Sequence, residues 1–497
     1  MSLSIIFTRA SLGIDAPLIT VEVHLSNGLP SLSIVGMPEA VVKESKDRVR
    51  SALINSQFEF PSRRITINLA PADLPKDGSR FDLPIAIGIL AASQQIPHES
   101  LSHYEFIGEL ALSGELRDVK AILPAAIACE RSGHTLLTST HNAQEASLCE
   151  YENIFGANSL LDICRHIHGE QPLQKVTAPL PVITPHNHDF MDVKGQAFAK
   201  RALEITAAGA HNILMYGPPG TGKTMLASRL PSIMPSLNTE QAIDVASIYS
   251  LCGQPYPHWS TPPFRNPHHS SSAVALVGGG SHPKPGEISL SHCGVLFLDE
   301  FPEFSRQVLE VLREPLESGE IYISRANAHV RFPSQFTLVA ALNPCQCGYF
   351  GSSIKTHYCR CSPDQVKRYR QKISGPLLDR IDLHVPVDHI PTTELQKMPI
   401  GEHSEIIKQR VVNARKIQWQ RQKKNNAQLT QQDMQTFCTL TPTIQKFLNT
   451  AVDTLGLSAR AYDKIIKTAR TIADLEATSA ISLDHIREAL AFRNFDR

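Results

Sequence analysis

The sequence has no excess of charge of either sign. It carries 48 Lys and Arg side chains and 48 Asp and Glu side chains among 497 residues, so the formal net charge is zero. A protein that coats nucleic acid presents a net positive field, and this chain lacks one. Any contact with DNA or RNA is therefore expected to be local.

Long hydrophobic runs are missing as well. No apolar run approaches the roughly 18 residues that span a bilayer. The first residues, MSLSIIFTRASLGIDAP, lack the basic, apolar and small-residue regions of a signal peptide. We therefore expect a cytoplasmic protein without a membrane partner. The apolar content of 42% suffices for ordinary cores, and the length suits about three domains of ~150 residues.

Cysteine is sparse and unevenly placed. The chain has 10 cysteines, and in a reducing compartment they are not expected to form a disulfide framework. Those that stand singly are interpreted as small buried hydrophobic residues: Cys129, Cys149, Cys164, Cys252, Cys293 and Cys438. The others form two C-x-C pairs within NPCQCGYFGSSIKTHYCRCS.

Strand and helix patterns divide the chain into four parts. Residues 1–170 alternate β-branched runs (LITVEVHL, RRITINLA) with helical stretches, which predicts an α/β domain. Prolines crowd residues 171–188, so we expect a linker there. Residues 189–390 contain strands that are apolar on both faces, as in a parallel sheet covered on both sides. Residues 391–497 are predicted to be almost entirely helical.

The stretch ILMYGPPGTGKTMLASRL predicts a phosphate-binding loop. An apolar strand leads into G-x-x-x-x-G-K-T and then an amphipathic helix, the context that this motif requires. Backbone N–H groups of such a loop wrap the β-phosphate at the positive end of the helix. We expect Lys223 to reach the β- and γ-phosphates of ATP and Thr224 to bind Mg²⁺. The expected ATP-binding residues are Gly217, Pro218, Pro219, Gly220, Thr221, Gly222, Lys223 and Thr224.

The stretch GVLFLDE predicts the second half of the nucleotide site. A buried strand ends in Asp299, placed to hold Mg²⁺, and Glu300, placed to polarise the attacking water. Asn343 ends the strand FTLVAALN, which should neighbour the Asp299 strand, so its amide can orient water. Arg380 and Arg460 are suited to the charge that develops during phosphoryl transfer, although spacing alone leaves a surface ion pair open for each.

Long motifs along the whole chain resemble the magnesium-chelatase-like AAA+ ATPases of the ComM and YifB group. They include GLPSLSIVGMPEAVVKESKDRVRSAL, FRNPHHSSSAVALVGGG, PGEISLSHCGVLFLDE, VLREPLESGEIYISRA, NPCQCG and LSARAYDKIIKTARTIADL. The resemblance implies that Asn343 is a sensor-1 residue. It also implies that Arg380 is an arginine finger acting on the neighbouring subunit's ATP, and that Arg460 is the sensor-2 arginine.

The resemblance further implies a homohexamer, assembled with ATP, that drives branch migration of recombination junctions during natural transformation. Its partners are then single-stranded DNA and branched junctions. Two alternatives remain open. The chain could be a protein remodeller or chelatase-type ATPase that acts on a protein partner, or an ATP-switched scaffold with negligible turnover.

Local candidates for DNA contact lie in two loops. LESGEIYISRANAHVRFPSQF is predicted to form a hairpin like the one that related AAA+ proteins insert in their channel, with Arg325 near its tip and Arg331 behind it. A solvated hairpin is the alternative. FRNPHHSSSAVALVGGGSHPKPGE offers Arg265, His268, His269 and Lys284, although the paired histidines could equally bind metal or brace a turn.

The two C-x-C pairs predict a zinc site. Cys345, Cys347, Cys359 and Cys361 can supply the closed tetrahedral sulfur shell that Zn²⁺ prefers, with His357 as a substitute ligand. The spacing is tighter than the usual C-x₂₋₄-C, and free thiols are the alternative. The loop after Asn343 has little apolar content, so a metal can hold it in place.

The first part of the chain resembles the proteolytic domain of Lon-type proteases. Alignment of LPKDGSRFDLPIAIGIL places Arg80 where the nucleophilic serine belongs, with Ser79 one position away, and alignment of FIGELALSGELRDVKAILPAAIA places Ala125 where the lysine belongs. We therefore expect a non-proteolytic domain. The predicted α/β protein combines this degenerate Lon-protease-like domain, an AAA+ P-loop core with a zinc-binding insertion, and an all-α lid.

Overall fold

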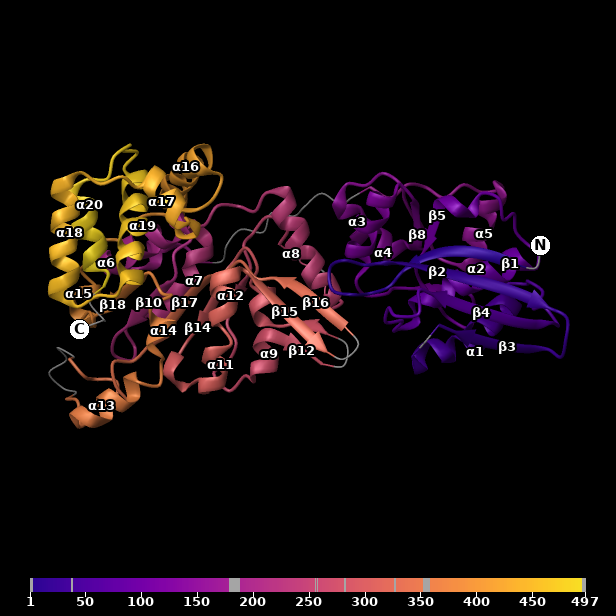
Figure 1. Ribbon diagram of the computed structural model, residues 1–497, viewed down its shortest axis with the longest axis horizontal. Coiled ribbons are helices and arrows are strands. Elements are labelled where there is room, and N and C mark those ends of the chain that lie inside the picture. The colour runs from indigo at the N-terminus through magenta and orange to yellow at the C-terminus, as the bar shows by residue number, and fades with distance from the viewer. Residues whose placement is uncertain are drawn as a thin grey trace.

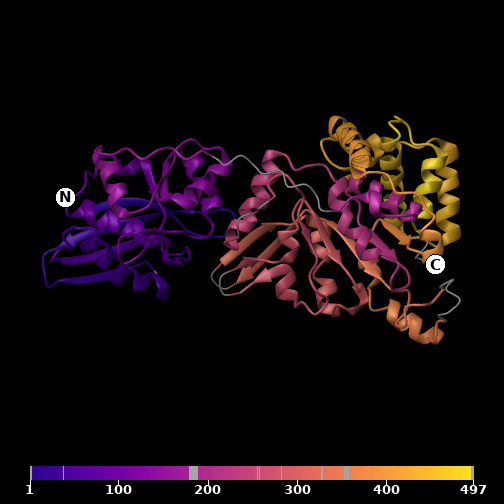
Figure 2. The same ribbon diagram turned by 180° about the vertical axis from the view of Figure 1, so that it is seen from behind.

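The chain forms an elongated molecule. Its N-terminal residues, central sheet and C-terminal helices follow one another along the long axis (Figure 1), and the reverse view shows the same order (Figure 2). The computed structural model describes residues 3–36, 39–177, 188–254, 256, 258–280, 283–325, 328–351 and 358–493.

A seven-stranded sheet organises residues 3–177, in the order β3-β4-β2-β1-β5-β8-β9. The predicted strands LITVEVHL and RRITINLA are antiparallel neighbours, with Val21 opposite Leu69. The strands are β1 Leu3–Arg9, β2 Leu18–Ser26, β3 Ser31–Val35, β4 Arg64–Ala70, β5 Tyr104–Phe106, β8 Thr135–Ser139 and β9 Ile154–Ala157, beside a small pair, β6 Glu109–Leu110 and β7 Leu116–Arg117.

The helices of this part cover the sheet. Every residue of α2 is buried, which explains why DLPIAIGILAA is apolar on all sides. The helices are α1 Ala40–Asn55, α2 Asp82–Ala92, α3 Ile122–Ser132, α4 Thr140–Ala146 and α5 Leu160–His168. Beyond them Lys175 bridges to Phe155 of β9, and residues 178–187 of the expected linker lie outside the described residues.

A parallel five-stranded sheet forms the centre of the molecule, in the order β11-β14-β17-β10-β18. Its side chains alternate between two apolar clusters, as Ile213 and Met215 join one and Leu214 joins the other. This doubly covered sheet was predicted. The strands are β10 Ile213–Tyr216, β11 Phe264–Arg265, β14 Val295–Leu298, β17 Thr337–Leu342 and β18 Leu383–Pro386.

Helices and two hairpins surround this sheet. The predicted hairpin is present as β15 and β16, with Ser324 opposite His329. The elements are α6 Ala197–Gly209, α7 Lys223–Ile233, α8 Thr239–Leu251, α9 Ala273–Val277, β12 Gly278–Gly279, β13 Lys284–Pro285, α10 Glu287–Leu290, α11 Arg306–Glu310, α12 Arg313–Ser318, β15 Glu320–Arg325, β16 Ala328–Pro333, α13 Pro363–Arg370 and α14 Gly375–Leu378.

The C-terminal region is helical, as predicted. It shares one apolar cluster with the central sheet, since Ile465 and Phe492 join Ile213 there. Lys464 also forms a 2.7 Å ion pair with buried Asp382. The helices are α15 Thr392–Leu395, α16 Ser404–Gln422, α17 Gln431–Phe437, α18 Pro442–Leu455, α19 Ala459–Leu475 and α20 Leu483–Ala491. Across the described part of the chain, no helix combines the length and apolarity needed to cross a membrane.

Among the described residues, several contacts join the N-terminal part to the centre. The Ala121 N–H donates to the carbonyl of Ser250 at 2.9 Å, and a Cβ on Gly13 would lie 2.5 Å from Val330 of the β15-β16 hairpin. A cavity of about 1150 Å³ lies between the parts, lined from both sides by residues that include Arg80 and Lys284.

Candidate functional site

The phosphate loop has the backbone that its motif predicts. It connects β10 to α7, and Gly220 and Gly222 adopt the left-handed conformation with φ of 77° and 89°. Gly217 is required for space, because a Cβ there would lie 2.1 Å from the carbonyl oxygen of Val387. The loop can therefore wrap an anion at the start of α7.

Lys223 is a buried cation at the centre of this loop. Its Nζ donates to the carbonyls of Gly217 and Pro218 at 2.8 and 2.9 Å, and to the amide oxygen of Asn343 at 3.2 Å. Burial lowers the pKa of Lys223 to about 8, although nearby Asp299 opposes this shift. A bound phosphate would replace the neutral hydrogen-bond partners of Lys223 by a negatively charged one. The site therefore fits the phosphate groups of a nucleotide.

Thr224 and Asp299 converge as the magnesium site requires. The Thr224 hydroxyl donates to Asp299 Oδ2 at 2.7 Å. β14 pairs in parallel with β17, which confirms that the Asp299 and Asn343 strands are neighbours. A hydroxyl and a carboxylate are the oxygen donors that Mg²⁺ takes in such loops. When bound there, Mg²⁺ would neutralise charge on the phosphate oxygens.

Glu300 lies at the mouth of this site with its carboxylate oriented by a histidine. Its backbone is left-handed, with φ of 50°, and its N–H donates to Asp299 Oδ1 at 2.9 Å. His269 Nδ1 lies 3.0 Å from Glu300 Oε2, and the Glu300 side chain is 53% exposed. A solvent-accessible carboxylate beside the phosphate loop suits the activation of water.

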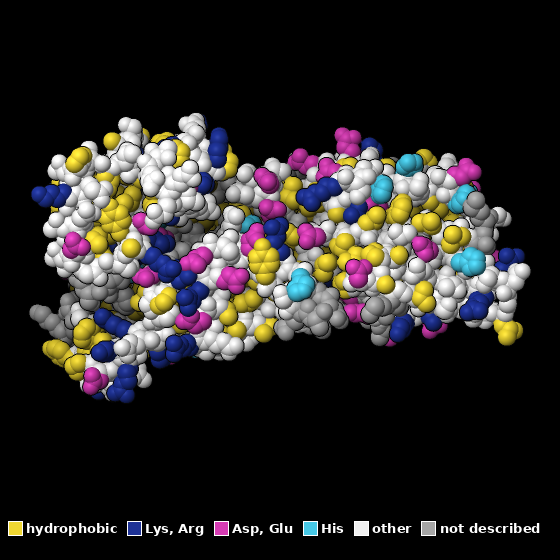
Figure 3. Space-filling model, in the orientation of Figure 1, with side chains coloured by type: hydrophobic (Ala, Val, Ile, Leu, Met, Phe, Trp, Pro, Cys, Tyr) yellow, Lys and Arg dark blue, Asp and Glu magenta, His cyan; other side chains and the backbone are white. Residues whose placement is uncertain are grey.

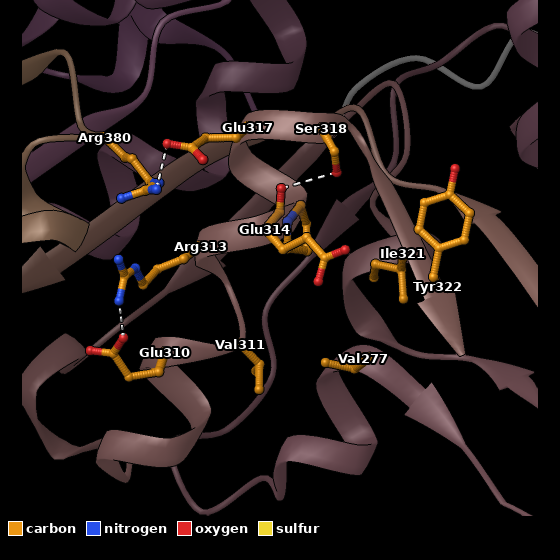
Figure 4. Close-up of a pocket in the computed structure, with 11 residues that line it drawn as sticks. Val277, Glu310, Val311, Arg313, Glu314, Glu317, Ser318, Ile321, Tyr322 and Arg380 are labelled. Carbon is orange, nitrogen blue, oxygen red and sulfur yellow. Dashed lines mark hydrogen bonds and ion pairs between the residues drawn. The ribbon is translucent and has the colours of Figure 1, made fainter. Parts of the chain in front are cut away.

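Arg380 is held inside the chain rather than projecting from it. It forms an ion pair with Glu317 of α12 and donates to the carbonyl of Pro376 at 2.6 Å. The residue is 8% exposed. It lines a pocket of about 510 Å³ together with Arg313 and Glu310, which form an ion pair with each other (Figure 4).

Arg460 lies exposed in the first turn of α19. The capping residue of this helix, Ser458, donates to Asp379 at 3.3 Å. Lys464, one turn further along, donates to the carbonyl of Arg380 at 3.1 Å. The start of α19 and the segment carrying Arg380 are therefore coupled, while the roles assigned to the two arginines stay predictions.

The side chains that are expected to contact DNA differ in whether other residues of the chain already bind them. Arg265 is bound to Glu287 by two hydrogen bonds of 2.6 and 2.8 Å, which raise its pKa. Arg331 pairs with Glu320 at 3.1 Å. His268 contacts Ser270 at 2.8 Å, and its ring lies tilted by 33° against that of His269 with the centroids 4.1 Å apart. Lys284 is exposed at the interdomain cavity. The Arg325 side chain lies outside the described residues.

The three positions compared with Lon-type proteases are engaged in other contacts. Arg80 is buried and donates to the carbonyls of Lys120 and Ala121 at 3.1 and 3.4 Å. The Ser79 hydroxyl donates to Glu109. Ala125 is fully buried. None of them forms a serine-lysine pair.

The four clustered cysteines converge on one point. Their ligand atoms all lie within 4.8 Å of one another. The Sγ atom of Cys345 lies 3.3 Å from that of Cys347 and 3.7 Å from that of Cys359. Sulfur atoms bound tetrahedrally at the usual ~2.3 Å from Zn²⁺ lie about 3.8 Å apart, whereas a disulfide needs about 2.0 Å. The cluster, which includes Cys361, therefore fits zinc, and His357 lies outside the described residues.

Because the four thiols share hydrogen bonds, their pKa values move apart: the pKa of Cys347 is lowered, and those of Cys359 and Cys361 are raised. Burial raises the pKa of Cys347, but hydrogen bonds with the backbone of Tyr349 and Arg360 and with neighbouring thiols outweigh it and lower that pKa to about 6. The thiolate is the metal ligand.

Zinc analysis tests this interpretation. We expect purified protein to contain about one zinc per chain, since four thiolates complete a structural site. Cys345→Ser removes the fully buried ligand and is expected to abolish stoichiometric zinc, while Cys438→Ser outside the cluster retains it. Metal analysis together with thiol titration provides the measurement. Well under one zinc, with all four thiols reactive, would contradict the site.

A basic helix that the sequence motifs did not predict lies beside the cluster. Lys and Arg side chains gather over α13 in the lower left of Figure 3. The exposed cations in this region are Arg360, Lys367, Arg368 and Lys372. Tyr358 beside them is 77% exposed. The run YCRCSPDQVKRYRQK carries this signal in its Lys and Arg residues.

Comparisons with known proteins decide the family. The "Competence protein ComM" of Haemophilus influenzae is 50% identical over 501 residues, covering 99% of this chain and 98% of that protein. The "Uncharacterized protein YifB" of Salmonella typhimurium is 49% identical over 500 residues, covering 100% of this chain and 98% of that protein. The chain belongs to the ComM and YifB family.

Three family descriptions account for most of this ComM/YifB chain. "Subunit ChlI of Mg-chelatase" matches residues 21–142, "Magnesium chelatase, subunit ChlI" matches residues 189–395, and "Magnesium chelatase, subunit ChlI C-terminal" matches residues 401–493. A more distant relative is the "Magnesium-chelatase 38 kDa subunit" of Cereibacter sphaeroides, 25% identical over 184 residues, covering 31% of this chain and 52% of that protein. The central region is thus a ChlI-type AAA+ ATPase domain.

Proposed function

We propose that this chain is an ATP-driven DNA motor that promotes branch migration of recombination junctions and so supports integration of DNA in natural transformation. One observation carries the proposal. A phosphate-loop motif whose Thr224 hydroxyl meets Asp299 lies in a chain that is 50% identical, over 99% of its length, to a protein named for competence.

Residues of one chain would perform the binding and activation steps. Lys223 and the loop N–H groups would bind the phosphates, and Thr224 and Asp299 would hold Mg²⁺. Glu300 would take up the proton of the attacking water, because its carboxylate is accessible beside the loop. Asn343 would orient that water from the neighbouring strand.

Positive charge that stabilises the transition state would also come from a second copy of the chain. We propose a homohexamer, assembled with ATP, in which Arg380 reaches the nucleotide of its neighbour and Arg460 closes the helical lid over its own nucleotide. The ion pair between Arg380 and Glu317 must then open on assembly. Contact between Ser458 and Asp379 would link the lid to this movement.

DNA would pass along the hairpins that project from the central sheet. The β15-β16 hairpin carries Arg325 and Arg331, and the β12-β13 hairpin carries Lys284. Phosphate contacts from such local cations position DNA without reading sequence, which agrees with the neutral chain. Residues 1–170 would form a non-proteolytic scaffold beside these hairpins, joined through the 171–188 linker to the core (189–390) and the lid (391–497).

A chelatase-type ATPase acting on a protein partner is the second candidate. The match to the "Magnesium-chelatase 38 kDa subunit" favours it, although that match covers only 31% of this chain. Both candidates use the same nucleotide site. Stimulation of ATP hydrolysis by DNA would separate them.

The test is movement of a synthetic three- or four-way DNA junction by the pure protein with ATP. We expect strand exchange that requires hydrolysis and is absent with Glu300→Gln. ATPase activity should rise when DNA is added. Hydrolysis without junction movement, at a rate that DNA leaves unchanged, would reject the DNA motor and favour the chelatase-type function.

A further inference from the structure

The chain leaving the sensor strand runs along the phosphate loop. The Gly217 N–H donates to the carbonyl of Leu342 at 3.2 Å, and Lys223 donates to the side chain of Asn343 at 3.2 Å. Residues 342–348 therefore follow the loop from its first residue onward. Beyond β17, which ends at Leu342, this segment is no longer part of the sheet.

The far end of the segment lies against the loop at Gly348. Its backbone is left-handed, with φ of 86°, and a Cβ there would lie 2.8 Å from Cδ of Pro219. Because that Cδ is bonded to the backbone nitrogen of Pro219, it cannot swing away like the tip of a flexible side chain. A side chain at position 348 would therefore push on the loop backbone.

The cysteine cluster determines where Gly348 lies. The Gly348 N–H donates to the carbonyl of Cys345 at 3.0 Å and closes a turn that contains two of the four cysteines. The Cys345 side chain is fully buried. Outside the cluster, Arg370 supports this turn with a 3.4 Å hydrogen bond to the carbonyl of Pro344.

We propose that zinc bound by the four cysteines positions the phosphate loop, so that metal occupancy controls the affinity for nucleotide. Bound metal holds the turn 345–348 rigidly in place beside Pro219. Without metal, the sulfur atoms have no common ligand, and the turn and the loop it supports shift together. This inference rests on the proposed nucleotide site alone and not on DNA movement.

Two glycines of the same loop provide a matched pair of variants. Gly348 and Gly351 both have a positive φ, 86° and 73°, so alanine strains the backbone at either position. Only at Gly348 does the new Cβ meet Pro219, since no described atom lies within 4 Å of a Cβ on Gly351. A difference between the two alanine variants therefore reports the contact with the phosphate loop rather than backbone strain.

The experiment measures zinc content and the Kd of a fluorescent ATP analogue for the full chain, without DNA. Gly348→Ala is expected to keep about one zinc per chain and to raise Kd at least about tenfold, whereas Gly351→Ala keeps Kd within about twofold. Adding Pro219→Ala to Gly348→Ala removes the ring and should recover part of the lost affinity. Zinc removal from the unaltered protein should weaken binding, and zinc addition should restore it.

Two results would overturn the inference. One is unchanged affinity in both Gly348→Ala and zinc-depleted protein. The other is an equal loss in Gly348→Ala and Gly351→Ala with no recovery from Pro219→Ala. A protein that binds nucleotide in this zinc-dependent way but moves no DNA junction would reject the proposed motor and leave this inference intact.

Discussion

Replacing Glu300 with glutamine is expected to lower kcat for ATP hydrolysis by about 10²–10⁴-fold while nucleotide binding is retained. Glutamine keeps the size of the side chain but cannot accept the proton of the attacking water. The phosphate loop and the Thr224–Asp299 contact do not involve this carboxylate, so Kd should change little. Steady-state ATPase assays measure the change in kcat, and a nucleotide-binding assay measures Kd.

Glu303→Gln is the matched control. Glu303 lies three residues further along and pairs with Lys372 at 3.1 Å at the surface, so its loss should leave kcat nearly unchanged. Turnover by Glu300→Gln close to that of the unaltered protein would show that another group activates water. His269, 3.0 Å from the Glu300 carboxylate, would then be examined next.

Replacing Arg380 with alanine is expected to lower kcat by about 10³–10⁵-fold, the effect of removing an arginine finger. The residue is tied to Glu317 in the single chain, so a purely structural role must also be tested. Glu317→Gln breaks the same ion pair but leaves the arginine in place. We expect Glu317→Gln to retain turnover, and a loss equal to that of Arg380→Ala would show that the pair only stabilises the fold.

Mixing two inactive variants tests action between subunits. Arg380→Ala keeps its own phosphate loop, and Lys223→Ala keeps its arginine. In randomly mixed rings about a quarter of the interfaces combine an intact loop with an intact arginine, so activity should reappear if the arginine acts on its neighbour. Arg313→Ala, which lines the same pocket but pairs with Glu310, is the control for local damage. No recovery on mixing would contradict action in trans.

Much of the nucleotide site was predictable because its signals are local. The spacing of glycines, lysine and threonine in GPPGTGKT depends on a single turn between strand and helix, and the loop has that backbone. The strand ending at Asp299 was recognisable from its apolar run. The pairing of β14 with β17 confirmed that the Asp299 and Asn343 strands are neighbours.

The four cysteines were also predictable as a cluster, since two short C-x-C pairs need only one loop to bring them together. The position of this cluster against the phosphate loop was not predictable from the sequence. Gly348 meets Pro219 across more than a hundred residues of chain, and no local pattern encodes such a contact. The cations of α13 follow the second C-x-C pair in the sequence, and the spacing alone does not show that the helix presents them to solvent.

The sequence by itself determined the family, the nucleotide motifs, the parallel central sheet and the helical C-terminal region. These features depend on short-range spacing and on the alternation of apolar residues, which each segment carries in its own residues. Only the tertiary structure decided the partners of individual charges: Glu317 for Arg380, Glu287 for Arg265 and His269 for Glu300. Such partners come from separate elements that the packing of the core brings together, so neither residue of a pair predicts the other.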